Sequence, residues 1–182
     1  MDQYIVNENG VLVEFIPENH EEPMYAVVPD GVNVIAESAF QYFAHLKSVT
    51  LPNSVVEIES GAFYECYELE TINIPESVAQ IGDEAFAHCY ALADADGFII
   101  VNNVLHGHVG NCEEVVIPSH VTRIGPRVFA NREHLKKVVL PEGLTSIGEE
   151  AFWYCGKLES IHFPASLIEI GDYAFQGTKI KH

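Results

Sequence analysis

The chain has 182 residues, of which 48% are hydrophobic and 20% charged, and 27 acidic against 9 basic residues give a formal net charge of −18. The longest apolar stretches are far shorter than a membrane span, and this acidic balance disfavours nucleic acid and anionic membranes as partners. The length fits one domain. The charge is uneven, because residues 1–97 hold 18 acids and one base whereas residues 98–182 hold 9 acids and 8 bases. The acidic half either serves solubility or favours a basic partner.

The first predicted element is a hairpin over about residues 4–13. Two apolar runs there, Tyr4-Ile5-Val6 and Val11-Leu12-Val13, flank a short polar segment that ends in Gly10. Glycine and asparagine in such a segment are typical of the tight connection between two antiparallel strands.

Prolines and phenylalanines then recur at fixed spacing, each phenylalanine 11 residues after its proline. In both series the steps are 23, 23, 43, 23 and 23 residues. The series are Pro29, Pro52, Pro75, Pro118, Pro141 and Pro164, and Phe40, Phe63, Phe86, Phe129, Phe152 and Phe175. A fixed period of this length indicates a solenoid, in which one supersecondary unit is copied and stacked.

Each repeat predicts the same elements in the same order. Residues 69–74 alternate between inward and outward positions, which is typical of a short strand, and Pro75 ends it because proline cannot donate to a ladder. A second short extended piece follows over residues 78–81. Gly82 then suits a tight turn or a helix start, and a brief helical turn over residues 84–86 carries the phenylalanine inward.

The step of 43 residues marks an interruption that predicts a second hairpin, at about residues 98–106. Asn102-Asn103 lies at its turn, where asparagine tolerates a positive φ. The chain is therefore predicted to be one solenoid domain over residues 1–182 with duplicated halves, 1–96 and 97–182. Its fold class is an α/β repeat of short strands and short helical turns, with six 23-residue repeats and a hairpin before each set of three.

The repeated pattern (I/L)P-x-x-(V/L)-x-x-IG-x-x-AF-x-x-C-x-x-L-x-x-(I/V) resembles the BspA-like leucine-rich repeat, also called the Treponema pallidum type. The resemblance covers roughly residues 28–92 and 113–182, and it implies a curved leucine-rich-repeat solenoid whose strand ladder lines the concave side. Members are often bacterial surface or secreted proteins that bind host matrix proteins or neighbouring cells. The start of this chain lacks signal-peptide features. The expected location is therefore cytoplasmic for a full-length chain, and the cell surface or the medium for part of a longer one.

The strand face is the candidate binding surface, because repeat proteins commonly bind through it. Its candidate residues are Thr71, Asn73, Glu114, Lys137, Val139, Ser160 and His162. A second outward column beside them comprises Asn33, Glu57, Gln80, Arg123, Ser146 and Glu169. An alternative surface on the helical-turn side comprises Tyr42, Tyr64, Tyr67, Tyr90, Trp153 and Tyr154. The other interpretation of both faces is a solvated surface without a partner.

No sequence pattern of a nucleophile with its base, a phosphate-binding loop or a zinc hydrolase is present, so we predict no enzyme and no cofactor. Cys66, Cys89 and Cys155 share one repeat position, where cysteine packs as a small hydrophobe; a disulfide between the first two is the less favoured alternative. His106, His108 and Cys112 have the residue types of metal ligands at short spacing. A metal site normally needs further firm ligands, so no metal is predicted.

These observations predict a non-catalytic protein-interaction module, and the resemblance to the BspA-like repeat implies the adhesin-like kind found on bacterial surfaces. The expected partner is a protein, with a host matrix or cell-surface protein as one class, and neither nucleic acid binding nor membrane insertion is expected. Two alternatives stay open: an intracellular scaffold with a bacterial partner, and a passive spacer cut from a longer repeat array.

Overall fold

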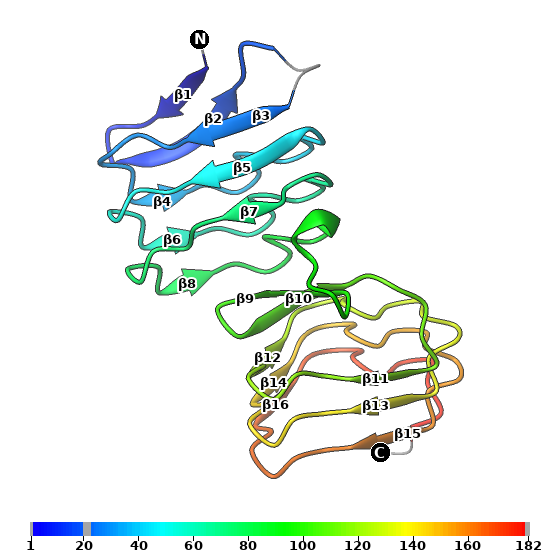
Figure 1. Cartoon of the computed structure of the whole chain (residues 1–182). Helices are drawn as coiled ribbons and strands as arrows, with labels where there is room; N and C mark the ends of the chain where they lie inside the picture. Colours follow the sequence, from blue (N-terminus) through cyan, green and yellow to red (C-terminus); the bar gives the residue numbers. More distant parts are fainter. Residues whose placement is uncertain (1, 20–22, 181–182) are drawn as a thin grey trace. The chain divides into compact units, whose positions relative to one another are not determined.

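The computed structural model of the chain describes residues 2–19 and 23–180. It divides the chain into two compact units, residues 1–92 and 93–182. Each unit is a coil of parallel strands, so the predicted repeat solenoid is confirmed (Figure 1). The organisation of both units into one continuous domain stays a prediction.

The first unit contains two parallel sheets and begins with an antiparallel hairpin. The larger sheet has the order β1-β2-β4-β6-β8 and the smaller one β3-β5-β7. The strands are β1 (Gln3–Val6), β2 (Val11–Ile16), β3 (Met24–Val27), β4 (Val34–Ile35), β5 (Leu46–Thr50), β6 (Glu57–Ile58), β7 (Thr71–Ile72) and β8 (Gln80–Ile81). The hairpin joins the coil because β2 pairs in parallel with β4, with Leu12 opposite Ile35.

The second unit repeats this topology. Its larger sheet has the order β16-β14-β12-β10-β9 and its smaller one β11-β13-β15. The strands are β9 (Phe98–Val101), β10 (Val104–His108), β11 (Glu114–Val116), β12 (Arg123–Ile124), β13 (Lys137–Val139), β14 (Ser146–Ile147), β15 (Ser160–His162) and β16 (Glu169–Ile170). The predicted hairpin turn is present, with φ of 48° at Asn102 and 61° at Asn103. Positive φ at both central residues matches the right-handed twist of the strands that they join.

A ladder of aromatic rings runs through the core of each unit. In the first unit Phe40 stacks on Phe63 with ring centroids 5.0 Å apart, and Phe63 on Phe86 at 5.3 Å. In the second, Phe152 lies 5.2 Å from the rings of both Phe129 and Phe175. Burying each such side chain contributes roughly 1.5–3 kcal/mol, and a single coil could not bury its own ring on both faces.

The predicted helical turns are not observed. The described residues contain one short 3-10 helix, η1 (Tyr90–Leu92), and the segments around each phenylalanine are turns. The residues two before and two after each phenylalanine have positive φ, namely Ser38, Gly61, Glu84, Arg127, Glu150 and Tyr173, and Tyr42, Glu65, His88, Asn131, Tyr154 and Gly177. A left-handed residue at these places ends any right-handed helix within a turn.

The hydrogen bonds of these segments explain why turns replace helices. The amide of Phe40 donates to the carbonyl of Ala62 in the next coil at 2.8 Å, and Phe129 donates to Ala151 at 2.8 Å. The same amides in a helix would donate to carbonyls four residues earlier in their own segment. Stacking of the coils therefore satisfies the backbone, and the spacing of apolar residues within one repeat does not reveal this.

The repeated glycine also has a role other than the predicted one. An added Cβ at Gly148 would lie 2.6 Å from the backbone carbon of Gly125, and at Gly171 it would lie 2.5 Å from the amide nitrogen of Glu149. Neither glycine has a positive φ. A side chain at Gly148 or Gly171 would therefore meet the backbone of the preceding coil, although the same repeat position holds Ala36 and Glu59 in the first unit.

Candidate interaction surface

The strand face of the second unit, β11, β13 and β15, places five of the seven candidate residues in two straight rows. The pairing aligns Glu114 with Lys137 and Lys137 with Ser160 in one row. In the other row Val116 lies opposite Val139, and Val139 lies opposite His162. Between the rows, Val115, Val138 and Ile161 point into the core, as period-2 alternation requires. The two rows therefore share one exposed surface.

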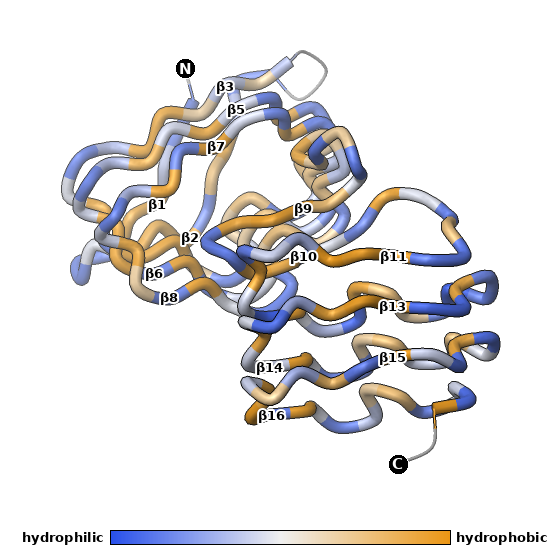
Figure 2. The backbone as a smooth tube through the Cα atoms, turned by 60° about the horizontal axis from the view of Figure 1, so that its bottom comes forward, coloured by the Kyte–Doolittle hydropathy of each residue, from blue (hydrophilic) through white to orange (hydrophobic). Residues whose placement is uncertain are grey.

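This strand face combines charge with an apolar spot. Lys137 and Glu114 form an ion pair between adjacent strands, and Lys136 pairs with Glu113 at 2.8 Å at the strand starts. Val116 is 59% exposed and Val139 37% exposed, although both are aliphatic. In Figure 2 the hydrophobic colour continues along β11 and β13 toward their C-terminal ends. Neighbouring exposed valines beside a charged row are a composition that protein interfaces commonly show.

The first unit carries the other two candidates, Thr71 and Asn73, on the corresponding sheet. Thr71 is exposed and lies opposite Ser48. Asn73 is exposed too, but its amide is occupied, because its Nδ2 donates to the carbonyl of Leu51 at 2.9 Å and its Oδ1 accepts from the Leu51 amide at 2.7 Å. The side chain of Asn73 therefore continues the hydrogen bonding between two adjacent coils beyond the end of β7.

Two residues of this sheet were missed by the sequence analysis. Tyr25 and Val27 are 65% and 63% exposed on β3, opposite Ser48 and Thr50. The signal was present, because Met24, Ala26 and Val28 alternate with them just before Pro29 and are buried.

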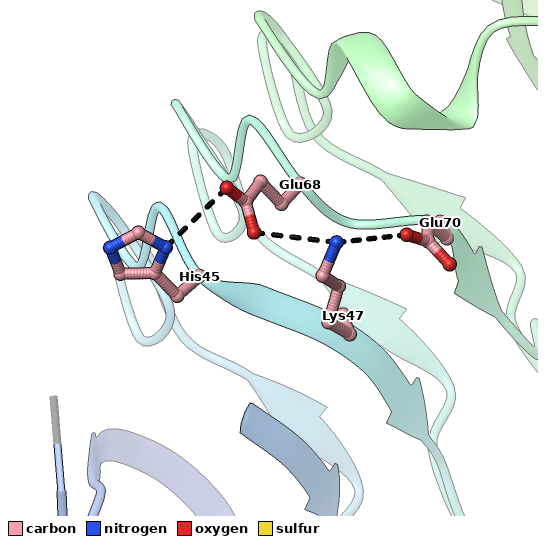
Figure 3. A network of polar contacts seen from close by, with 4 residues as sticks. All are labelled: His45, Lys47, Glu68 and Glu70. Carbon is pink, nitrogen blue, oxygen red and sulfur yellow. Dashed lines mark hydrogen bonds and ion pairs between the residues drawn. The ribbon is translucent and has the colours of Figure 1, made fainter. Parts of the chain in front are cut away.

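A polar network connects the starts of β5 and β7 (Figure 3). Lys47 lies between two carboxylates, 2.9 Å from Glu70 and 3.4 Å from Glu68, and His45 lies 3.4 Å from the other oxygen of Glu68. The hydrogen bond from Lys47 lowers the pKa of Glu68, and the hydrogen bond to Glu70 raises the pKa of Lys47. The one lysine or arginine in residues 1–92 is thus already paired.

The predicted second outward column is wrong at one position. Val34, Glu57 and Gln80 lie side by side in β4, β6 and β8, as do Arg123, Ser146 and Glu169 in the second unit. Val34 therefore takes the place that was predicted for Asn33. The side-chain Nδ2 of Asn33 instead donates to the carbonyl of Asn9 in the hairpin loop, at 3.0 Å.

The cysteines of the repeat position are free and buried. The thiols of Cys66, Cys89 and Cys155 donate to the carbonyls of Phe40, Phe63 and Phe129 in the preceding coil, at 2.9, 3.1 and 3.0 Å. Burial raises the pKa of Cys66 to about 12 and also raises the pKa values of Cys89 and Cys155. These thiols therefore pack and hold carbonyls, and they are poor nucleophiles.

The histidines of the second hairpin belong to the core. The ring of His108 lies between Phe98 at 4.9 Å and Phe129 at 5.6 Å, and His106 is also buried. Burial lowers the pKa of both histidines. The positive charge of Arg132 lowers the pKa of His108 further, and that of Arg123 helps to lower the pKa of His106 to about 4. Within the described ranges, 2–19 and 23–180, no group of three or more His, Cys, Asp or Glu side chains could hold a metal ion. Over the same ranges no helix is long and apolar enough to cross a membrane.

Stacked parallel strands, an aromatic ladder and an exposed strand face define a leucine-rich-repeat solenoid. The chain belongs to the family of the BspA type leucine rich repeat region, whose model matches residues 24–97 and 99–182 with six copies of the repeat. A search of curated proteins finds no match.

Several solved structures are similar to this chain. One is a leucine rich cell surface protein from Faecalibacterium prausnitzii, with 31% identity, a TM-score of 0.55, and coverage of 84% of this chain and 45% of that one. Leucine-rich repeat proteins from Eubacterium ventriosum and Bacteroides ovatus are similar at 27% and 25% identity, with TM-scores of 0.56 and 0.51. They cover 98% and 99% of this chain, which spans 49% and 56% of theirs. The chain thus spans about half the length of these relatives.

Proposed function

We propose that this chain is a non-catalytic protein-interaction module that binds through the strand face of β11, β13 and β15. The observation that carries the proposal is the strand register, which aligns Glu114, Lys137 and Ser160 beside Val116, Val139 and His162 on one exposed sheet. A straight array of short exposed side chains offers a partner many weak contacts at once. It does not form the enclosed, convergent site that catalysis requires.

The two rows favour a folded protein partner with a complementary surface. The valines supply an apolar centre that becomes dehydrated on binding, and the paired Glu114 and Lys137 beside them supply orientation. Thr71 belongs to the equivalent sheet of the first unit and extends the proposal to that unit. Asn73 contributes by holding the ladder, because its amide is bound to Leu51.

The location and the class of partner rest on similarity. A relative at 31% identity is described as a cell surface protein, which supports a place for this chain on a bacterial surface or in the medium. The partner is then a protein of the host matrix or of a neighbouring cell surface. The intracellular scaffold and the passive spacer are the alternatives that the experiment must separate from this function.

The test compares two double variants in solid-phase binding to purified extracellular matrix proteins and to intact host cells. Lys137→Glu with Val139→Asp changes the strand face. Lys157→Glu with Ile168→Asp makes the same chemical changes at exposed positions of the same unit outside the sheet. We expect saturable binding by the unaltered chain, at least a tenfold loss in the face variant, and a change below threefold in the control.

Two results would contradict the proposal. Equal loss in both variants would mean that general charge and solubility govern binding. Absence of saturable binding to any matrix or cell preparation would favour the intracellular scaffold or the passive spacer, provided that circular dichroism shows the chain folded.

A further inference from the structure

A second surface, on the turn side of the first unit, differs in chemistry from the strand face. Five aromatic side chains form a continuous series there, which we call the aromatic strip: Tyr42, Tyr64, His88, Tyr90 and Tyr67. In that order, adjacent ring centroids lie 6.0, 5.2, 5.6 and 5.8 Å apart. The hydroxyl of Tyr90 and Nδ1 of His88 are hydrogen-bonded at 2.7 Å. The rings therefore hold one another in place.

The strip is open to solvent although its members are aromatic. Tyr42 is 62% and Tyr90 is 47% exposed, and Tyr67 and His88 are also exposed. Tyr42 and His88 have φ of 66° and 63° at the repeat position where Asn131, Tyr154 and Gly177 stand in the second unit. Asparagine and glycine suit that conformation, whereas a bulky side chain there carries a conformational cost. The core ladder does not require these rings, since it consists of the buried phenylalanines.

Carboxylates border the aromatic strip. Glu65 accepts a hydrogen bond from the hydroxyl of Tyr67, which raises the pKa of that phenol to about 12. Burial raises the pKa of Tyr64, and the negative charges of Glu65 and Glu84 raise it further. Residues 1–92 contain a single lysine or arginine, Lys47, which already pairs with Glu68 and Glu70. Within the first unit the strip therefore lies among an excess of acidic residues, and the one lysine of this unit is already paired.

We propose that the aromatic strip is a docking site for an extended, arginine-rich segment of a partner protein. A guanidinium group stacks on tyrosine faces and donates in a plane to carboxylates, so the tyrosine rings with Glu65 beside Tyr67 provide both of its preferred contacts. The negative field of the first unit raises the rate at which such a segment arrives. This site lies outside the strand face, and its failure would leave the proposed function intact.

The turn side of the second unit provides a natural contrast. The repeat positions of Tyr64, Tyr67 and Glu84 are occupied in the fourth repeat by Ala130, Glu133 and Arg127. Arg127 pairs with Glu150 at 2.7 Å, and Arg132 donates to the carbonyls of His108 and Gly110. Trp153 donates from Nε1 to Gln176 at 3.2 Å. Cations already occupy that side, so it should not select an arginine-rich segment.

The test measures the fluorescence anisotropy of a labelled peptide of six Arg-Gly pairs with the full chain, at low and at moderate salt. Peptides of six Lys-Gly pairs and of six Gln-Gly pairs serve as probe controls. We expect the arginine peptide to bind at least threefold more tightly than the lysine peptide, with weaker binding at higher salt, and the glutamine peptide not to bind. Tyr67→Leu with Tyr90→Leu should weaken binding of the arginine peptide at least tenfold, whereas Tyr154→Ala with Tyr173→Ala should change it less than twofold.

A measurement on the unaltered chain avoids dependence on variants that fold poorly. Nitration of tyrosines, mapped by mass spectrometry, should be suppressed by the arginine peptide at Tyr42, Tyr67 and Tyr90 and unchanged at Tyr154 and Tyr173. Equal binding of the lysine and arginine peptides, without protection of these tyrosines, would overturn the proposal in favour of unspecific charge attraction. Protection by neutral oligosaccharides and not by the arginine peptide would overturn it in favour of a glycan site.

Discussion

The two hairpins occupy the same place in the two units but cover the aromatic ladder with different side chains. In the first unit the ring of Phe15 packs at a tilt against Phe40, with centroids 5.1 Å apart, and Phe15 is paired across the hairpin with Tyr4. In the second unit His108 takes the place of Phe15, next to Phe129, and is paired with Phe98. The register to the adjacent coil is preserved, since Leu12 and Leu105 lie opposite Ile35 and Ile124. The same backbone therefore accommodates either an inert or a titratable ring at the start of the ladder.

The largest effect is expected where the two ladders are alike. Phe63→Ala and Phe152→Ala each remove a ring that is stacked on both sides, and each should lower the free energy of unfolding of its unit by about 3–5 kcal/mol. Urea unfolding monitored by circular dichroism measures this loss. A cost below about 1 kcal/mol in either unit would mean that the ladders are not equivalent.

Acidification should destabilise the second unit more than the first. The pKa values of His106 and His108 are lowered in the folded unit, so the unfolded chain binds more protons below pH 6.5. The second unit therefore has its full free energy of unfolding above about pH 6.5 and loses part of it as the pH falls toward 4. His106 alone accounts for a loss of about 3 kcal/mol. Labelling of buried thiols in urea measures the opening of each unit separately, because Cys155 lies in the second unit and Cys66 and Cys89 lie in the first. The ratio of these labelling rates is compared at pH 7 and pH 4.5. His108→Phe should remove only the part of the pH dependence that comes from His108 and leave the part from His106, and equal loss in both units would contradict the assignment.

The repeat position of Gly148 also differs between the two units. Gly148→Ala should lower the free energy of unfolding of the second unit by about 1–3 kcal/mol, because the added methyl group meets the backbone of the previous coil. The first unit differs here, because Glu59 occupies the equivalent position. Gly143→Ala, where an added Cβ meets nothing within 4 Å, is the matched control and should change stability by less than about 0.5 kcal/mol. Equal costs in urea unfolding would show that close approach of the coils does not govern this position.

The smallest expected effect concerns thiol reactivity in the native state. Iodoacetamide at pH 8 should label Cys112, which is exposed, and leave Cys66, Cys89 and Cys155 unmodified. Peptide mapping of the labelled chain would therefore find one modified thiol in the second unit and none in the first. Native labelling of Cys66 would contradict its raised pKa and its hydrogen bond to Phe40.

The period of 23 residues was sufficient to predict the coil and most of the core, because it determines which side chains face inward. The two hairpins were predicted from their local apolar runs and from Gly10 and Asn102-Asn103 at their turns. The period did not predict the turns around Phe40 and Phe129, since their amides bond to the next coil and no single repeat shows this. The burial of His108 within the ladder also depends on pairing across the hairpin. The repeat spacing does place Tyr25 and Val34, because they stand at the same distance from Pro29 as Ser48 and Glu57 stand from Pro52.

The donation of turn amides to the following coil has a consequence for how order is lost. A helix carries its own hydrogen bonds, whereas each of these coils depends on a neighbour to keep its backbone satisfied. The molecule therefore behaves as a nearest-neighbour chain, and disorder at a terminal coil exposes the amides of the coil before it. Hydrogen exchange should consequently show protection that rises from the last coil of each unit toward its middle, as fraying proceeds inward one coil at a time.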